Sequence, residues 1–457
     1  MAITKASVQA SAGARELPDV SRGQKLYRRA RQIIPGATQL FGKRAELYLP
    51  EHWPAYYSKA KGCRIWDLDG NEYLDFTMCG IGTSVLGYAD TDVENAVIAA
   101  VKSGNMATLN CPEEVELAEL LCELHPWAQK VRFARSGGEI MAMAARIARA
   151  ASGRDKIAFC GYHGWHDWYL AVNLGSSSGL DSHLLPGLEP LGVPRALQGT
   201  MLPFNYNKLD ELEAIVSAHG SELAAIIMEP VRSDGPAKGF LEGVRDLATK
   251  SGTVLVFDEI TCGWRMATSG MHMIYGVAPD IATFAKTMSN GFPMAAVIGR
   301  GDVMDYAQRT FISSAYWTEK SGPAAALATL RKHRKIDAGQ LLSATGRTVQ
   351  QGWSRAAESA GIKIRITGLP PITSFAFEDA DSLGLQTYFI QEMLARGFLA
   401  SDRFYAMCAH GSDEVNAYLQ AVTEVFHLIS DALRTGDVRN KLKGPVKQAG
   451  FTRLTDA

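Results

Sequence analysis

The sequence has no long hydrophobic run, few cysteines and almost no net charge. No window approaches the roughly 18 consecutive apolar residues of a membrane-spanning helix, so no membrane partner is expected. The 47 basic and 48 acidic side chains nearly cancel, which disfavours nucleic acid as a partner. The first 25 residues contain no apolar stretch of the kind found in secretory signals.

The seven cysteines are scattered along the 457 residues, and none forms a C-x-x-C pair. This spacing disfavours both a zinc ribbon and a disulfide framework. Reduced thiols are typical of cytoplasmic proteins, so a cytoplasmic location is expected. The composition, 47% apolar and 21% charged, is that of a folded protein long enough for two or three units.

The chain divides into four expected parts. Residues 1–23 are polar and predict a flexible N-terminal arm, and residues 24–80 predict a short helix and a β-hairpin that join a small domain. Residues 81–330 predict the large domain, and residues 331–457 a C-terminal small α+β domain. In that last part, helices are expected over 343–360 and 415–434, and strands over 363–367 and 373–377.

Helical stretches alternate with short apolar runs through the expected large domain. Runs of this length that are apolar throughout are typical of strands buried on both faces. The alternation with helices predicts an α/β fold with a mostly parallel sheet. The helices are expected over 92–103 and 113–124, and the strands over 131–134, 157–160, 224–228, 254–257, 281–285 and 295–298.

Three of the expected strands end in residues that can do chemistry. The first ends in Glu229, the second in Asp258 and the third in Lys286. Ligands of open α/β sheets bind outside the carboxyl ends of the strands. Each acid alone is more often a solvated loop residue, but three such endings in order favour a site.

Lys286 follows an apolar run and precedes the sequence Thr-Met-Ser-Asn-Gly. In a partly dry pocket its amine pKa would fall, and the neutral amine would be a nucleophile suited to a Schiff base with a carbonyl. The alternative is a lysine that extends from the strand end into solvent.

The segment from Arg135 to Glu139 contains Ser136, Gly137 and Gly138 at the expected start of a helix. Two glycines let the backbone approach a ligand, and the helix N-terminus offers free N–H groups to an anion. The alternative is a glycine-rich helix start with Ser136 as its cap. The pattern is neither a Walker loop nor G-x-G-x-x-G, so no nucleotide is indicated.

An aromatic-rich segment, residues 161–169, follows another expected strand and is suited to stacking a flat ring. Its residues His163, His166 and Asp167 lack the spacing of a zinc-binding helix, so no metal is expected. An aromatic cluster within the core is the alternative interpretation.

The order of these motifs resembles the class III (ω-type) aminotransferases, a group that includes glutamate-1-semialdehyde 2,1-aminomutase. The resemblance covers residues 24–430 and is specific because order and spacing both agree. It implies pyridoxal-phosphate enzymes of fold type I, with a mostly parallel seven-stranded sheet and a smaller α+β domain. The motifs that carry it are Trp66–Asp75, Ser136–Glu139, Tyr162–Gly164, Glu229–Pro230, Asp258–Ile260, Gly263, Arg265, Lys286 and Thr318.

The resemblance implies a role for each matching residue. Lys286 would hold pyridoxal 5'-phosphate covalently and shuttle a proton, and Asp258 would pair with the ring nitrogen of the cofactor. Glu229 would stand near its O3′ side. Phosphate binding would fall to Ser136, Gly137 and Gly138, and ring contacts to Tyr162, His163 and Ile260. Thr318 would reach the phosphate of a neighbouring subunit, which implies a homodimer with active sites at its interface.

Two positions depart from the family pattern. The family usually has Thr at the position of Gly138, so one phosphate-binding hydroxyl is missing and backbone N–H groups must compensate. The residues before Thr318 read Ser-Ala-Tyr-Trp instead of a glycine-bearing stretch. Trp165 and Trp168 resemble a branch of the family found among carbohydrate and nucleotide-sugar gene clusters.

The expected reaction is transfer of an amino group from a small-molecule amino donor to an oxo acceptor by a ping-pong Schiff-base mechanism. The acceptor would be an aldehyde or ketone, including a sugar or secondary-metabolite intermediate. An intramolecular 2,1-aminomutase is the alternative, and a non-catalytic cofactor-binding protein is a remote one. Gln39, Phe41 and Trp165 are weak candidates for the substrate side, and Lys43, Arg44, Arg232, Arg265 and Arg403 for gripping a substrate carboxylate.

Overall fold

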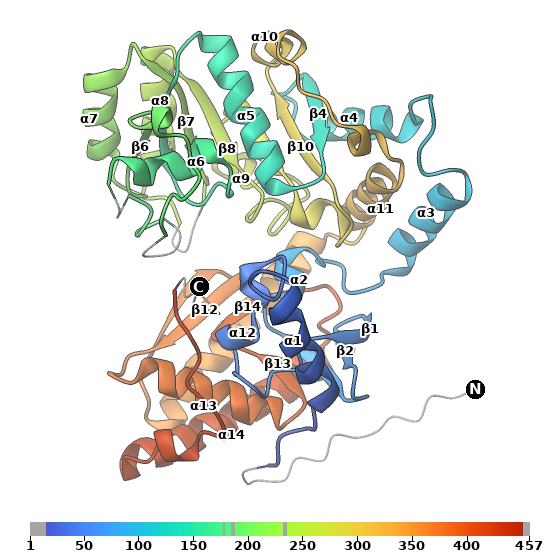
Figure 1. Ribbon diagram of the computed structural model, residues 1–457, viewed down its shortest axis with the longest axis vertical. Coiled ribbons are helices and arrows are strands. Elements are labelled where there is room, and N and C mark those ends of the chain that lie inside the picture. Colours follow the sequence, from blue (N-terminus) through green and yellow to red (C-terminus); the bar gives the residue numbers. More distant parts are fainter. Residues whose placement is uncertain (1–14, 177–178, 184–187, 232–234, 451–457) are drawn as a thin grey trace.

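The computed structural model describes residues 15–176, 179–183, 188–231 and 235–450. Figure 1 shows two bodies, one above the other: the upper holds a large sheet and its helices, and the lower combines the beginning and the end of the chain. Residues 1–14 of the expected N-terminal arm lie outside the described ranges. Within those ranges, no helix is both long and apolar enough to span a bilayer.

The upper body contains a seven-stranded sheet with the order β4-β10-β9-β8-β7-β5-β6. Strand β10 is antiparallel to both of its neighbours, and every other pairing is parallel, so the expected mostly parallel sheet is confirmed. Sequence reasoning did not predict β6, which has only three residues and ends in a proline. The strands are β4 Lys130–Ala134, β5 Lys156–Cys160, β6 Met201–Pro203, β7 Leu223–Met228, β8 Val254–Asp258, β9 Ile281–Phe284 and β10 Ala295–Gly299.

Helices cover both faces of this sheet, which explains why its strands are apolar throughout. Residues Ala225 and Ile227 of β7 pack toward α5 (Gly137–Ser152), whereas the alternate residues Ile226 and Met228 pack toward α7 (Leu209–His219) and α8 (Phe240–Ser251). All six residues of β7 are buried. Successive side chains of a strand point to opposite faces, so every position meets a helix.

Three further helices pack together beside β4, and the remaining helices of this body are short. The predicted helices over 92–103 and 113–124 are confirmed. The three are α3 Thr91–Lys102, α4 Pro112–Leu124 and α11 Ser321–Lys335; the short ones are α6 Asp167–Leu170, α9 Met271–Tyr275 and α10 Gly301–Met304.

The lower body is built around two small sheets, β1-β2-β3-β13 and β11-β12-β14. The predicted hairpin is confirmed as β2 and β3, and β3 pairs in parallel with β13 through Leu74 and Phe398. A strand from before residue 80 therefore shares a sheet with one from the end of the chain. The strands are β1 Tyr57–Lys61, β2 Arg64–Asp67, β3 Glu72–Phe76, β11 Ile364–Leu369, β12 Ile372–Phe377, β13 Phe398–Ala400 and β14 Arg403–Tyr405.

The helices of the lower body are α1 Ser21–Ile33, α2 Cys79–Gly82, α12 Ala338–Ala360, α13 Ser382–Leu394 and α14 Ser412–Thr435. The two long helices predicted near the C-terminus are confirmed as α12 and α14, although α12 contains Gly346 and Gly352. A Cβ at Gly346 would lie 1.8 Å from the carbonyl oxygen of Pro370, and one at Gly352 would lie 2.3 Å from Leu419. The glycines permit close packing, which offsets their low helix propensity.

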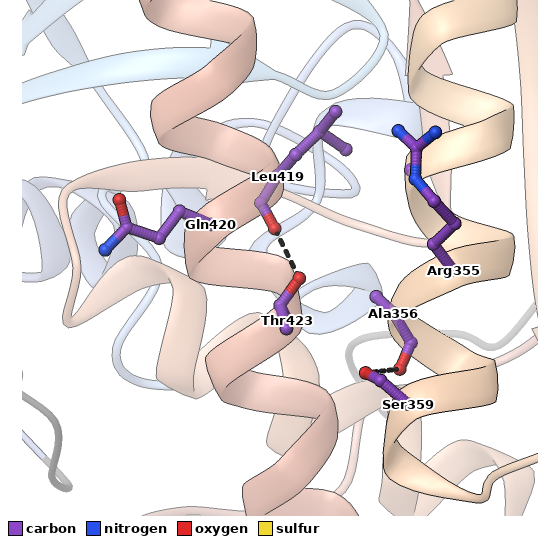
Figure 2. A pocket seen from close by; sticks show the side chains of 7 residues that line it. Arg355, Ala356, Ser359, Leu419, Gln420 and Thr423 are labelled. Atoms are coloured by element: carbon purple, nitrogen blue, oxygen red, sulfur yellow. Dashed lines mark hydrogen bonds between the residues drawn. The ribbon is translucent and has the colours of Figure 1, made fainter.

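A groove of about 350 Å³ lies between α12 and α14 (Figure 2). Its two hydroxyl groups are already used within their own helices, since Ser359 donates to the Ala356 carbonyl and Thr423 to the Leu419 carbonyl, both at 2.9 Å. None of the predicted cofactor residues lines this groove, so it is separate from the candidate active site.

Candidate active site

The loops that follow β5, β7 and β8 meet the N-terminus of α5 at the carboxyl edge of the large sheet. A Cβ at Gly161 would lie 2.6 Å from Glu229 Oε2, and one at Gly137 would lie 3.3 Å from Ile260 Cδ1. These short distances show that Glu229 and Ile260, predicted from separate motifs, stand against the two glycine-bearing loops. The structure therefore brings the motifs together at one edge, as expected from parallel strands.

Asp258 is the last residue of β8, and its buried carboxylate is paired with a buried histidine. Its Oδ2 lies 2.8 Å from His163 Nδ1, and its Oδ1 accepts a hydrogen bond from the Ile260 amide at 3.0 Å. The other ring nitrogen of His163 lies 3.1 Å from the carbonyl oxygen of Cys160. His163 thus lies behind Asp258 and fixes the orientation of its carboxylate.

Lys286 begins the turn after β9, with its amine inside the cluster. Its Nζ donates to Thr261 Oγ1 at 2.7 Å. Burial lowers the pKa of Lys286, and the positive charge of Arg265 lowers it further, while Asp258 and Glu229 oppose the shift. The residue has a left-handed φ of 44°, a backbone conformation that costs about 1–3 kcal/mol in a residue other than glycine. The structure therefore places an amine with a lowered pKa at the carboxyl edge of the large sheet.

Arg265 is buried next to this cluster. Its Nε donates to the Thr261 carbonyl at 3.0 Å and its Nη2 to the Gly82 carbonyl at 2.5 Å. Burial lowers its pKa to about 10. The two contacts fasten α2 of the lower body to the loop after β8.

The predicted anion cradle, Ser136 to Gly138, lies at the start of α5. Ser136 caps the helix: its hydroxyl accepts from the Glu139 amide at 3.5 Å, while Glu139 Oε2 accepts from the Ser136 amide at 2.9 Å. The structure confirms Ser136 as the cap of the helix. The anion site stays a prediction, consistent with the amides of Gly137 and Gly138, which have no intrahelical partner in the first turn. These amides lie at the positive end of the helix dipole, which favours binding of an anion such as phosphate.

Aromatic rings border the cradle on the β5 side. Tyr162 is 42% exposed, and burial of its remainder together with the negative charge of Asp258 raises its pKa. Trp165 is 68% exposed and stacks on His166 with ring centroids 4.4 Å apart. Tyr162 thus lies within electrostatic reach of Asp258, whereas Trp165 and His166 lie against Gly138.

Thr318 is exposed in a short turn, Ala315–Thr318, and its hydroxyl donates to the Ala315 carbonyl at 2.8 Å. Arg135 anchors the residues on both sides of it, donating to the carbonyl oxygens of Trp317 and Glu319, each at 2.9 Å. Arg135 also forms a partly buried ion pair with the Glu319 carboxylate at 2.7 Å. The turn is therefore held beside the start of α5, with Thr318 at the surface.

The predicted substrate-side residues from the N-terminal segment lie on a loop after α1. Gln39 is exposed, and Phe41 is half-buried under the guanidinium of Arg44 at 4.8 Å. A Cβ at Gly42 of this loop would lie 3.7 Å from Ile81 Cδ1 of α2, and Gly82, the residue after Ile81, accepts the hydrogen bond from Arg265. The loop is linked in this way to the cluster. Arg403 is exposed on β14, and Arg232 lies outside the described residues.

Sequence reasoning missed two residues that the structure places in the cluster. Thr261 accepts a hydrogen bond from the amine of Lys286, and the ring of His166 lies against Gly138. Thr261 carries a weak signal, since it lies between Ile260 and Gly263 within a motif that had been recognised. Across the described ranges, no group of three or more His, Cys, Asp or Glu side chains is arranged to hold a metal ion.

The comparisons with known proteins agree with this geometry. Residues 49–402 match the family model "Aminotransferase class-III", which covers well over half of the chain. The chain belongs to this family of pyridoxal-phosphate-dependent enzymes of fold type I. Three relatives illustrate the range of the family.

Among curated relatives, the 3-aminobutyryl-CoA aminotransferase of Cloacimonas acidaminovorans is 31% identical, covering 89% of this chain and 96% of that protein. The glutamate-1-semialdehyde 2,1-aminomutase of Syntrophobacter fumaroxidans is 33% identical, over 89% of this chain and 97% of that protein. Among solved structures, the FumI protein of Sphingopyxis sp. MTA144, in its PLP internal aldimine form, superposes with a TM-score of 0.82. It is 26% identical and covers 93% of this chain and 98% of that one.

The residues present fit pyridoxal phosphate at three points. The two glycines and free amides of α5 suit a phosphate, the carboxylate of Asp258 suits a protonated ring nitrogen, and the amine of Lys286 suits an aldehyde. When bound, this cofactor supplies an electron sink for cleavage of a bond at the substrate carbon that bears the amine.

Proposed function

We propose that the chain is an aminotransferase that moves an amino group from a small-molecule amino donor to an aldehyde or ketone acceptor. The observation that carries this proposal is the amine of Lys286, whose pKa burial lowers, held at 2.7 Å by Thr261 beside the paired carboxylate of Asp258. A neutral amine can attack a carbonyl and later take up and return a proton at Nζ.

Each neighbour of Lys286 has a distinct task in this proposal. Asp258 holds a positive ring nitrogen, and His163 orients the carboxylate. Tyr162 and Ile260 contact the two faces of the ring, and Glu229 stands at its O3′ side. Ser136, Gly137 and Gly138 bind the phosphate through the start of α5.

The second candidate is an intramolecular 2,1-aminomutase, which the aminomutase relative favours. Both reactions need the same amine, carboxylate and phosphate cradle, so these residues do not separate them. A mutase keeps its intermediate enclosed, whereas a transaminase releases one product before binding the second substrate.

A half-reaction screen tests the proposal directly. The purified holoenzyme is mixed with single amines, and conversion of the bound cofactor to its pyridoxamine form is followed by absorbance. A transaminase converts with at least one donor and returns only when an oxo acceptor is added. If glutamate, alanine and glutamine all fail while an amino aldehyde isomerises without a donor, the mutase is correct. The absence of both activities would contradict the assignment as an enzyme.

A homodimer with active sites at the subunit interface is part of the proposal. Phe311 and Tyr316, near Thr318, are 91% and 73% exposed, as expected of apolar residues that a second copy covers. Light scattering is expected to give twice the chain mass, and Phe311→Glu is expected to lower that mass and weaken cofactor binding. A monomer with full cofactor affinity would contradict this arrangement.

A cytoplasmic location is also proposed, because no disulfide joins any of the seven cysteines, all of which lie in the described ranges. Cell fractionation with antibody detection tests it, and recovery in a secreted or envelope fraction would contradict it.

A further inference from the structure

His166 carries a buried polar atom that nothing in the described structure uses. Its Nδ1 is shielded from solvent and has no hydrogen-bond partner. Buried polar atoms are nearly always satisfied, so an exception at an active-site edge needs an explanation. Burial also lowers the pKa of His166, despite the opposing negative charges of Glu139 and Asp167, which leaves a neutral imidazole.

The unused nitrogen lies against the phosphate cradle. A Cβ built on Gly138 would lie 3.1 Å from Nδ1 of His166, 3.0 Å from its Cε1 and 3.2 Å from Nε1 of Trp165. The edges of the two rings therefore fill the space where a side chain at position 138 would stand. Trp165 stacks on His166 with an interplanar angle of 22°, which fixes the direction of the imidazole.

Gly138 is also the position at which this chain departs from its family. A threonine there would supply a hydroxyl to the phosphate, but it would collide with the rings of Trp165 and His166. The chain has thus exchanged a side chain on α5 for two rings from the loop after β5, and one of those rings has a nitrogen to spare.

We propose that His166 donates a hydrogen bond from Nδ1 to the phosphate of the cofactor and so replaces the hydroxyl that Gly138 lacks. His166 is then a cofactor-binding residue, and Trp165 positions its ring. A neutral imidazole protonated at Nδ1 is a suitable donor, and a bond to an anionic phosphate is stronger than one between neutral groups. The inference rests on the proposed placement of the phosphate at Ser136–Gly138.

Equilibrium binding to the apoenzyme tests the proposal without relying on activity. Pyridoxamine phosphate is the first probe, since it has no aldehyde to react with Lys286, and pyridoxamine, which lacks the phosphate, is the second. His166→Phe keeps a flat ring for stacking on Trp165 and removes only the donor. It is expected to weaken pyridoxamine phosphate binding about tenfold or more and to leave pyridoxamine binding nearly unchanged.

Trp168→Phe is the matched control. It removes another buried N–H without a partner from the same segment, at a residue that does not border Gly138. Its affinity for both probes is expected to stay within about twofold of the wild type. His166→Gln, which keeps a donor, is expected to lie between His166→Phe and the wild type.

Replacing the imidazole of His166 by a threonine hydroxyl at position 138 gives an independent measurement. Gly138→Thr alone is expected to weaken binding because the new side chain meets the imidazole. Adding His166→Ala removes that collision, so the double variant is expected to bind pyridoxamine phosphate more tightly than either single variant. Recovery of this kind also shows that the double variant is folded.

Three results would overturn the proposal. One is wild-type affinity of His166→Phe for pyridoxamine phosphate, and another is an equal loss of affinity for both probes, which a purely structural role would produce. The third is a wild-type protein that binds pyridoxamine phosphate no better than pyridoxamine. Only this third result also contradicts the proposed phosphate site, so the two failures are distinguishable.

Discussion

Two consecutive acids at the end of β8 are both buried and both paired with histidine, yet their surroundings differ. Asp258 Oδ2 lies 2.8 Å from His163, and Glu259 Oε1 lies 2.7 Å from His272. Successive residues of a strand point to opposite faces of the sheet. Asp258 therefore faces α5 and the cradle, whereas Glu259 faces α9 on the other side.

The Glu259–His272 pair is closed, in the sense that its hydrogen-bonding groups all have partners within the described protein. Glu259 accepts from the amides of Met271 and His272, from His272 Nδ1 and from the thiol of Cys262. The Nε2 of His272 accepts from the indole N–H of Trp127 at 2.9 Å, which places the proton on Nδ1 and leaves the ring neutral. Every polar atom has its partner within the protein, so this pair fastens α9 to the sheet.

The Asp258 pair is open by comparison. Within the part of the chain that the structure describes, the partners of its carboxylate are His163 and the Ile260 amide, and a carboxylate has room for about four hydrogen bonds. The negative charge of this carboxylate acts to raise the pKa values of Tyr162 and Lys286. The two acids therefore differ in unused hydrogen-bonding capacity, and not in burial or in having a histidine partner.

The largest expected effect is at Lys286, the amine on the open side. Lys286→Ala should abolish turnover and the visible absorbance of covalently bound pyridoxal phosphate, because no other amine of the cluster can replace Nζ. Steady-state assays and absorbance spectra measure both. A variant that kept both properties would end the assignment of this site.

Asp258→Asn should lower kcat about a hundredfold or more while leaving the fold intact. Breaking a buried charge pair costs about 3–5 kcal/mol, and each 1.4 kcal/mol is tenfold in rate. Steady-state kinetics on the cofactor-saturated variant measures the loss. Glu259→Gln is the matched control, since it neutralises the adjacent acid; a larger kcat loss in that control would reverse the assignment of the two pairs.

Glu259→Gln should act on stability instead. It replaces a buried carboxylate that accepts hydrogen bonds with an amide whose NH2 group cannot accept them. The free energy of unfolding should therefore fall by about 3 kcal/mol, with kcat within a few-fold of the wild type. Denaturant unfolding measures the difference. Glu222→Gln, which breaks an exposed ion pair with Lys156, should cost less than about 1 kcal/mol. Equal losses in the two variants would refute the structural role of Glu259.

The smallest expected effect is a change in how the stability of the protein depends on pH at acid pH. Burial would raise the pKa of Glu259, but the hydrogen bonds from the His272 ring and from the amides of Met271 and His272 keep that pKa below its usual value near 4.5. A carboxyl with a lowered folded-state pKa contributes stability above the unfolded-state pKa and loses it as pH falls through the folded-state pKa. Melting temperatures of Glu259→Gln should therefore fall less steeply below about pH 4.5 than those of the wild type. Parallel curves for the two proteins would show that Glu259 does not contribute.

Much of the fold could be predicted from the sequence, because buried strands and amphipathic helices carry their own patterns. Six of the seven strands of the large sheet were expected, and only the three-residue β6 was missed. The boundaries at residues 23, 80 and 330 remain predictions, as do the roles of Gln39, Phe41, Trp165 and Thr318. The contribution of His166 could not be predicted, since it depends on the distance between two loops and not on spacing along the chain.

The sequence by itself determined the class of fold, the family and the residues at the ends of the strands. These properties follow from local periodicity and from the order of motifs, which the chain carries whatever its conformation. Only the tertiary structure decided which acid of the Asp258–Glu259 pair stays open, and which ring stands over Gly138. Such choices depend on the partners that distant segments bring to each polar atom, and those partners are set by packing.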